Sequence, residues 1–179
     1  MAKPEQFQTY DESGTPLELV PRATVHRVGD WHRAVNVFLF RSDGRLVIQR
    51  RSSCKDVCPG MWDLSVAEHV LPGEEYLEAA HRGLAEELSL YSVKLKPLGA
   101  ELKGRFTDLE RGTKDNEFQQ CFSGVSDDEI TIDGVEVIDV AFYELDKLQQ
   151  KMGVTPELFT PWFIRLASRA EWFAQPFNG

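Results

Sequence analysis

The stretch GEEYLEAAHRGLAEELSL, residues 73–90, predicts one amphipathic helix over residues 75–88. Pro72 and Gly73 interrupt the chain just before it, and this pair is typical of a turn. Apolar residues then recur three and four positions apart, the spacing that places side chains on one face of a helix. The predicted buried face consists of Leu77, Ala80, Leu84 and Leu88, and the opposite stripe consists of Glu78, Arg82 and Glu86.

The acidic residues of this helix are not balanced by basic ones. Residues 74–90 contain one arginine and no lysine against five glutamates, Glu74, Glu75, Glu78, Glu86 and Glu87. Solvated helices usually relieve such repulsion with basic residues four positions away. Bound cations would do the same, and oxygen ligands select Mg²⁺ or Mn²⁺. The charge pattern by itself is equally consistent with an ordinary solvated face.

Length and composition are those of one globular domain. The 179 residues carry a net charge of −9, which argues against nucleic acid or an anionic membrane as the main partner. The apolar runs are too short to span a bilayer, and the N-terminus does not resemble a signal peptide. Three cysteines, a low and odd number, favour a reducing, cytoplasmic compartment. We expect a monomer or homodimer that acts on a small molecule.

The rest of the chain predicts a mixed α/β domain. Strands are expected at residues 7–20 (two, joined by a turn at 11–14), 34–40, 45–50, 62–70, 93–102, 117–124 and 135–143. A short helix is expected at residues 145–151. A last helix begins after Thr155 or Thr160, because each is followed by a proline.

The acidic helix resembles the signature of the Nudix hydrolases. Glu74, Arg82 after seven intervening residues, Leu84 and the pair Glu86-Glu87 stand at the spacing of that signature. The resemblance implies a Nudix-like α/β/α sandwich with a mixed β-sheet. In such a fold Glu74, Glu86 and Glu87 would hold Mg²⁺ or Mn²⁺, Arg82 would orient a glutamate, and the metals would bind a diphosphate. These four residues are the expected catalytic residues.

Three positions depart from the signature. Glu68 replaces its first glycine, Gly83 replaces the glutamate after the arginine, and Ser89 replaces its late glycine. Glu68 adds a carboxylate near the implied metals. Gly83 removes an acid, and a glycine inside a helix costs about 1 kcal/mol relative to alanine. One alternative is therefore a catalytically weak Nudix binding module.

A second resemblance, to isopentenyl-diphosphate isomerases and their Nudix relatives, covers most of the chain. The motifs that carry it are Pro21-Arg22, His32-Arg33-Ala34, Gln49-Arg50-Arg51, Lys55, Pro59-Gly60-Met61-Trp62, His69, Gly73-Glu74 and Phe159-Thr160-Pro161-Trp162. The resemblance implies a second metal site at His26, His32, His69 and Glu117, near Asp115. It also implies that Arg51 and Lys55 contact a diphosphate. We expect residues 1–30 to form a β-hairpin extension packed on the core and residues 31–179 to form the Nudix domain.

Position 67 separates the two chemistries that these resemblances imply. The isomerases use a catalytic cysteine there, and this chain has Ala67, whose methyl group can neither donate nor accept a proton. The isomerases also lack the first of the paired helix glutamates, and this chain keeps both Glu86 and Glu87. These two differences favour hydrolysis of a nucleoside diphosphate, or of a small molecule linked to one, with an isomerase-like enzyme as the alternative.

The sequence leaves the general base unassigned and does not predict a structural zinc site. The general base is one of four glutamates, Glu68, Glu86, Glu117 and Glu136. Cys54 and Cys58 have the spacing of half a zinc site, but no second pair of cysteines or histidines at ligand spacing follows them, so a structural zinc is not expected.

Overall fold

The computed structural model describes residues 5–169, 172 and 173. Its elements are β1 (Gln6–Tyr10), β2 (Pro16–Pro21), α1 (Arg22–Val28), β3 (Trp31–Phe40), β4 (Leu46–Arg51), β5 (Trp62–Asp63), β6 (Val66–His69), α2 (Tyr76–Leu88), β7 (Leu95–Pro97), β8 (Leu102–Asp108), β9 (Thr113–Val125), β10 (Val137–Tyr143), α3 (Leu145–Val154), a 3₁₀ helix (Pro156–Leu158) and α4 (Pro161–Ala167). None of the helices in the described ranges is long and apolar enough to cross a membrane.

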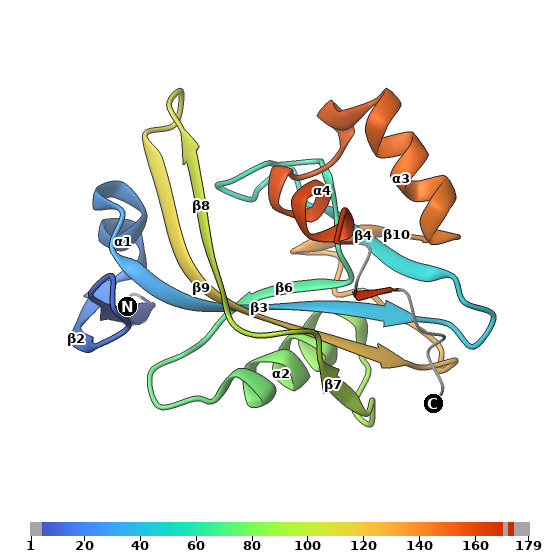
Figure 1. Cartoon of the computed structure of the whole chain (residues 1–179), viewed down its shortest axis with the longest axis horizontal. Coiled ribbons are helices and arrows are strands. Elements are labelled where there is room, and N and C mark those ends of the chain that lie inside the picture. The colour runs from blue at the N-terminus through green and yellow to red at the C-terminus, as the bar shows by residue number, and fades with distance from the viewer. Residues whose placement is uncertain (1–4, 170–171, 174–179) are drawn as a thin grey trace.

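The strands form one mixed sheet with β3 at its centre (Figure 1). β3 runs parallel to β9, with Trp31 opposite Asn116 and Phe40 opposite Val125, and antiparallel to β6. The strands predicted at residues 34–40 and 45–50 are both present, but they hardly pair with each other. β4 pairs with β3 at Phe40 and Leu46 alone, and its main partner is β10.

Helices cover both faces of this sheet, so the predicted α/β/α sandwich is confirmed. In Figure 1, α2 lies below the sheet, and α3 and α4 lie above it. The side chains of β3 alternate between the two layers, as the geometry of a strand requires. Val35 and Val37 pack in the cluster that contains Leu84 of α2, whereas Phe38 packs in the cluster that contains Phe163 of α4.

The central helix begins one residue later than predicted. Glu75 is its N-cap and forms a capping box with Glu78, which satisfies backbone donors of the first turn. The prediction that Leu77 lies on the buried face is wrong, because its side chain is 45% exposed. The other three predicted residues, Ala80, Leu84 and Leu88, are buried, and Gly83 adds to this face where the helix contacts β6. The buried residues are Ala79, Ala80, Gly83, Leu84, Glu87 and Leu88.

The structure corrects the predicted elements at two further places and decides between the two predicted starts of the last helix. The single strand expected at residues 62–70 is two short strands, because Ser65 between them accepts a hydrogen bond from the Leu39 N–H and donates one to the Val47 carbonyl. The sequence prediction missed β8, which pairs with β9 along its whole length. The last helix begins after Thr160.

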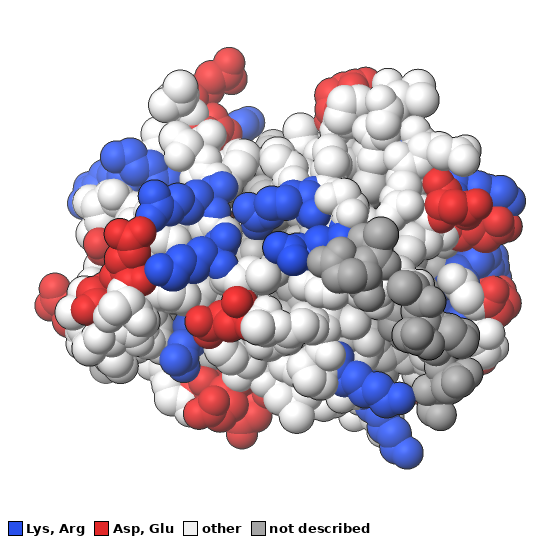
Figure 2. Space-filling view, viewed as in Figure 1, with Lys and Arg blue, Asp and Glu red and all other residues white. Residues whose placement is uncertain are grey.

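The negative net charge is unevenly distributed over the surface. Figure 2 shows basic side chains gathered between α1 and α4 on the face that carries β8. Lys103 and Arg105 of β8 both lie over the Trp31 ring, 5.4 and 4.9 Å from its centroid. This face is locally basic although the chain is acidic.

Close packing explains why position 83 is a glycine. A Cβ atom added to Gly83 would lie 2.5 Å from Cγ1 of Val66 and 3.3 Å from Cβ of Glu68. We expect Gly83→Ala to lower the melting temperature, because overpacking costs about 1–3 kcal/mol and exceeds the gain in helix propensity of about 1 kcal/mol. Differential scanning calorimetry of the purified variant would measure this loss.

Gly153 in α3 provides a matched control, since a Cβ atom there would meet nothing within 4 Å. Gly153→Ala should leave the melting temperature unchanged or raise it slightly. Adding Val66→Ala to Gly83→Ala should recover part of the lost stability, because it removes the contacting methyl group. Equal effects of the two glycine substitutions would contradict the packing explanation.

Candidate functional site

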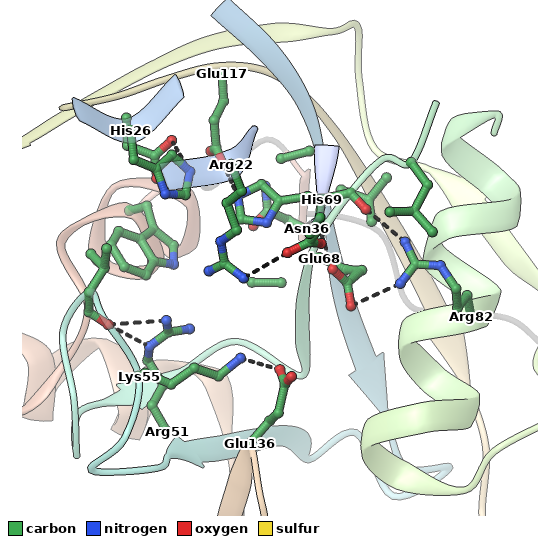
Figure 3. Close-up of a pocket in the computed structure, with 18 of the residues that line it drawn as sticks. Arg22, His26, Asn36, Arg51, Lys55, Glu68, His69, Arg82, Glu117 and Glu136 are labelled. Atoms are coloured by element: carbon green, nitrogen blue, oxygen red, sulfur yellow. Dashed lines mark hydrogen bonds and ion pairs between the residues drawn. The ribbon is translucent and has the colours of Figure 1, made fainter. Parts of the chain in front are cut away.

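One cavity of about 310 Å³ collects most of the predicted site residues (Figure 3). It opens over the sheet face that carries His69 of β6 and Glu117 of β9. The predicted residues that line it are His26, Arg51, Lys55, Glu68, His69, Arg82, Glu86 and Glu117. Glu86 of the predicted helix metal site therefore shares the cavity with three residues of the predicted histidine site, whereas Glu74, Glu87 and His32 do not line it.

Three histidines and an aspartate converge at one end of this cavity. His26 comes from α1, His32 from β3, His69 from β6 and Asp115 from β9, and one ligand atom of each lies within 4.8 Å of the others. The sheet brings them together, because the parallel pairing of β3 with β9 sets His32 opposite Glu117, and the pairing of β3 with β6 places His69 nearby. Glu117 completes the group, with its carboxylate 3.6 Å from Nε2 of His69.

Unpaired atoms in this cluster fit a bound cation. His26 Nε2, His32 Nε2 and Asp115 Oδ1 are buried and make no hydrogen bond of good geometry, although His32 Nε2 lies 3.3 Å from Asp115 Oδ1. Nδ1 of His32 lies 3.1 Å from the carbonyl oxygen of Asp30. When Nδ1–H donates to this carbonyl, Nε2 is left as a free lone pair, which is the usual arrangement of a metal-ligating histidine. Imidazole nitrogens together with carboxylates suit a divalent transition ion such as Mn²⁺.

Burial and mutual charge set the protonation of the cluster. Burial, together with the neighbouring His32 and His26, holds the pKa of His69 well below its ordinary value. Burial also acts to lower the pKa of His32, but the adjacent Asp115 carboxylate outweighs it, so that pKa is raised. Burial and the charge of Asp115 raise the pKa of Glu117 to about 7. His69 therefore stays neutral at pH 7, as metal ligation requires.

A second group of carboxylates lies where α2 meets β6. Glu87 is 4% exposed and its Oε2 atom has no partner in the structure. Burial, together with the nearby Glu68 carboxylate, raises the pKa of Glu87 to about 8. Burial also raises the pKa of Glu68, although Arg82 partly offsets it. A buried and a partly buried carboxylate that repel each other are a suitable site for a divalent cation.

Arg82 links the remaining acidic residues of the signature. It donates to both carboxylate oxygens of Glu74, at 2.9 and 3.0 Å, and to the His69 carbonyl at 2.7 Å. The sequence analysis assigned Arg82 to orienting a glutamate, and in the structure it contacts Glu74, Glu68 at 3.1 Å and Glu86 at 3.4 Å. Glu86 is 62% exposed and Glu74 is held by Arg82. Metal ligation by these two residues stays a prediction.

Basic residues line the side of the cavity away from α2. Lys55 forms an ion pair with Glu136. Arg51 donates two hydrogen bonds to the Val57 carbonyl and one to Asp63 at 3.1 Å. Arg22 of α1 also lines the cavity, where it pairs with Glu5 at 3.1 Å. The sequence analysis did not select Arg22 as a site residue, although Pro21-Arg22 is one of the motifs of the isomerase resemblance.

Asp63 is a buried anchor that the sequence analysis missed. Its side chain is inaccessible to solvent, and it accepts hydrogen bonds from Arg51, from the Thr160 hydroxyl at 2.8 Å and from the Trp162 indole N–H at 2.9 Å. It therefore fixes one predicted diphosphate ligand and one aromatic wall of the same cavity. The sequence feature that could have identified Asp63 is its position as a charged residue between Trp62 and Leu64, inside a predicted strand.

Known proteins resemble this chain over most of its length. The NUDIX domain model matches residues 30–163. The chain is 35% identical to an isopentenyl-diphosphate Delta-isomerase of Pectobacterium atrosepticum, over 94% of this chain and 92% of that protein. It is 32% identical to one of Streptomyces avermitilis, over 92% of this chain and 82% of that protein.

Solved structures show the same fold. DR0079 of Deinococcus radiodurans superposes with a TM-score of 0.75 at 24% identity, over 92% of this chain and 98% of that one. The MutT protein of Methanosarcina mazei superposes with a TM-score of 0.63 at 20% identity, over 81% of this chain and 96% of that one. The domain match spans most of the chain and the curated relatives share about a third of its residues, so the protein belongs to the Nudix superfamily, in the branch that resembles isopentenyl-diphosphate isomerase.

Proposed function

We propose that this protein is a metal-dependent hydrolase that cleaves a diphosphate bond in a nucleoside diphosphate or in a small molecule linked to one. The observation that carries the proposal is the composition of the shared cavity. Glu68, Lys55 and Arg51 line the cavity, as does Ala67 with its methyl group, and Glu87 is buried close enough to Glu68 and Lys55 for their charges to act on its pKa. Such a site can hold a cation and a diphosphate, but it has no proton donor at position 67.

Each group of side chains has its own task in this reaction. Glu87 and Glu68, with Glu74 and Glu86 of the signature, would hold Mg²⁺ or Mn²⁺. When bound, such an ion polarises phosphate oxygens and lowers the pKa of a coordinated water. Arg51 and Lys55 would neutralise the charge that develops on the leaving phosphate. Lys55 must exchange its ion pair with Glu136 for the phosphate when substrate binds.

The second candidate is an isomerase acting on isopentenyl diphosphate. The names of the curated relatives favour it, as does the cluster of His26, His32 and His69. Ala67 opposes it, since allylic proton transfer needs a group on each side of the substrate and one of them is absent. A cavity that binds nucleotide without turning it over would be a third candidate, motivated by the departures from the signature at Glu68, Gly83 and Ser89.

A substrate screen separates these candidates. The wild-type protein would be incubated with nucleoside diphosphates, their conjugates and isopentenyl diphosphate, each with Mg²⁺ or Mn²⁺, and the products separated by anion-exchange chromatography. We expect metal-dependent cleavage of at least one nucleotide. Double-bond migration in isopentenyl diphosphate without diphosphate cleavage would overturn the proposal. Nucleotide binding without turnover would also overturn it and would favour the third candidate, a binding module.

The variant Ala67→Cys, assayed in the same screen, tests the role of position 67. On the hydrolase proposal it should leave the rate of nucleotide cleavage within about twofold, because position 67 takes no part in activating water. If the variant gains isomerase activity while the wild type has none, the scaffold retains isomerase geometry and only the proton donor is missing. A large loss of hydrolysis would show instead that position 67 contacts the reacting groups.

A further inference from the structure

Gln119 is a buried glutamine beside the three histidines, and the sequence analysis did not select it. It is 2% exposed and lies on β9 two residues after Glu117, so the two side chains lie on the same face of the sheet. Its Nε2 atom donates a hydrogen bond to Oε2 of Glu117 at 2.5 Å, and its Oε1 atom accepts one from Nη2 of Arg165 at 3.0 Å. The amide therefore bridges α4 and the candidate metal site.

The chemistry of its two partners fixes the orientation of this amide. A guanidinium can only donate hydrogen bonds, and a carboxylate, in the ionised form that binds a cation, can only accept them. With its oxygen toward Arg165 and its NH₂ group toward Glu117, Gln119 satisfies both. Turning the amide over would set two oxygens against each other at Glu117 and two donors against each other at Arg165.

Gly104 provides the space that this amide occupies. It stands opposite Glu117 in the pairing of β8 with β9. A Cβ atom at this position would lie 2.7 Å from both Cδ and Nε2 of Gln119. Even a methyl side chain at position 104 would therefore displace the amide from Glu117.

The bridge leaves the two oxygen atoms of Glu117 with different neighbours. Oε2 accepts the hydrogen bond from Gln119, whereas Oε1 lies 3.6 Å from Nε2 of His69 and 3.8 Å from Nε2 of His32. Figure 3 shows Glu117 pointing into the cavity near His26 and His69. Because Oε2 is held, Oε1 stays directed at the histidine nitrogens, where a bound cation would need an oxygen ligand.

We propose that Gln119 is a positioning residue that orients the Glu117 carboxylate for a divalent cation held with the three histidines, and that Arg165 acts on this site only through Gln119. Carboxylate ligands are commonly held by such outer hydrogen bonds, and the loss of one costs about 10- to 100-fold in metal affinity. This role is the same whether the protein hydrolyses a diphosphate or isomerises one, because it concerns binding of the cation alone.

Calorimetric titration of the substrate-free protein with Mn²⁺ tests this role. The binding step of the histidine site is identified as the one that His69→Ala removes. Methionine has nearly the length of glutamine without its hydrogen-bonding atoms, so we expect Gln119→Met to weaken this step about 10- to 100-fold. Gly104→Ala should also weaken it, since this substitution leaves the glutamine intact but displaces its amide.

Gln120 provides the matched control. It is the next residue of β9, its side chain lies on the opposite face, and its amide donates to the carbonyl oxygens of Cys121 and Gly99. Gln120→Met removes the same atoms from the same strand and should leave the Mn²⁺ affinity unchanged.

A double-mutant cycle tests whether Arg165 acts through Gln119. Arg165→Met should weaken Mn²⁺ binding less than Gln119→Met does, because Glu117 alone still favours the correct orientation of the amide. Adding Arg165→Met to Gln119→Met should cause no further loss, since the two residues act in series. Additive losses would overturn the claim that Arg165 acts only through Gln119.

The positioning role is overturned if Gln119→Met leaves the Mn²⁺ step unchanged, if Gln120→Met weakens it equally, or if the wild type shows no step that depends on His69. A purely structural glutamine would lower the melting temperature of the metal-free protein and leave the Mn²⁺ affinity of the folded protein unchanged. Turnover is measured separately with nucleotide substrates, so failure of the hydrolase proposal and failure of the role of Gln119 are distinguishable.

Discussion

Glu87→Gln should abolish most metal-dependent turnover and at the same time stabilise the metal-free protein. Loss of the carboxylate removes both charge and position from a bound cation, which corresponds to several kcal/mol of transition-state stabilisation, or about 10²–10³-fold in rate. The stabilisation follows from burial. Glu87 is 4% exposed beside Glu68, so its ionised form is disfavoured in the folded protein.

The stabilisation should depend on pH with a defined sign. The pKa of Glu87 is raised in the folded state from its ordinary value of 4.5 to about 8. Between these values the folded protein binds more protons than the unfolded chain, so the stability of the wild type falls as pH rises through this window. Glutamine does not titrate, and the melting temperature of Glu87→Gln should exceed that of the wild type little at pH 5 and most at pH 8.

Differential scanning fluorimetry with a chelator, from pH 5 to pH 8, measures this difference, and steady-state phosphate release measures the rate. Added Mg²⁺ or Mn²⁺ should raise the melting temperature of the wild type at pH 8 more than that of the variant. Glu110→Gln is the control, because Glu110 is exposed on a surface loop. A Glu87→Gln protein that keeps its turnover, or that melts lower than the wild type at pH 8, would refute this account of Glu87.

The second large effect is expected at Asp63. Asp63→Ala leaves the Arg51 guanidinium, whose side chain is 11% exposed, without its buried partner. Removing one partner of a buried ion pair costs about 3–5 kcal/mol, because the remaining charge stays buried without compensation. Thr160 and Trp162 lose their acceptor in the same step. Urea denaturation should show a correspondingly lower midpoint.

Ligand binding should weaken together with stability, because Asp63 positions Arg51 at the cavity. Titration with methylenediphosphonate at a temperature where the variant is folded measures this effect separately. Asp43→Ala is the matched control, since Asp43 forms an Arg–Asp pair with Arg45 at 2.7 Å in which both side chains are about half exposed. Exposed pairs contribute little. If the two substitutions change stability and affinity equally, Asp63 is not a buried anchor.

Several elements of this protein follow from short-range sequence patterns. The helix at Tyr76–Leu88 was predicted to within one residue, because apolar spacing and an acidic N-cap act within a few turns. The first two strands and their turn were predicted for the same reason. β8 was missed, because Lys103, Gly104 and Arg105 have little preference for strands. Its pairing with β9 decides its conformation.

The sequence by itself determined the helix that carries the acidic residues, the family, and the choice of His26, His32 and His69 as candidate ligands. The tertiary structure decided how these side chains lie relative to one another and how deeply their charges are buried. Pairing of β3 with β6 and β9 brings histidines far apart in the chain to within 4.8 Å of one another and of Asp115. Burial then raises the pKa of Glu87 and anchors Arg51 on Asp63. Helical periodicity depends on neighbouring residues, whereas the solvation of a charge depends on every segment packed around it, so only the folded chain determines it.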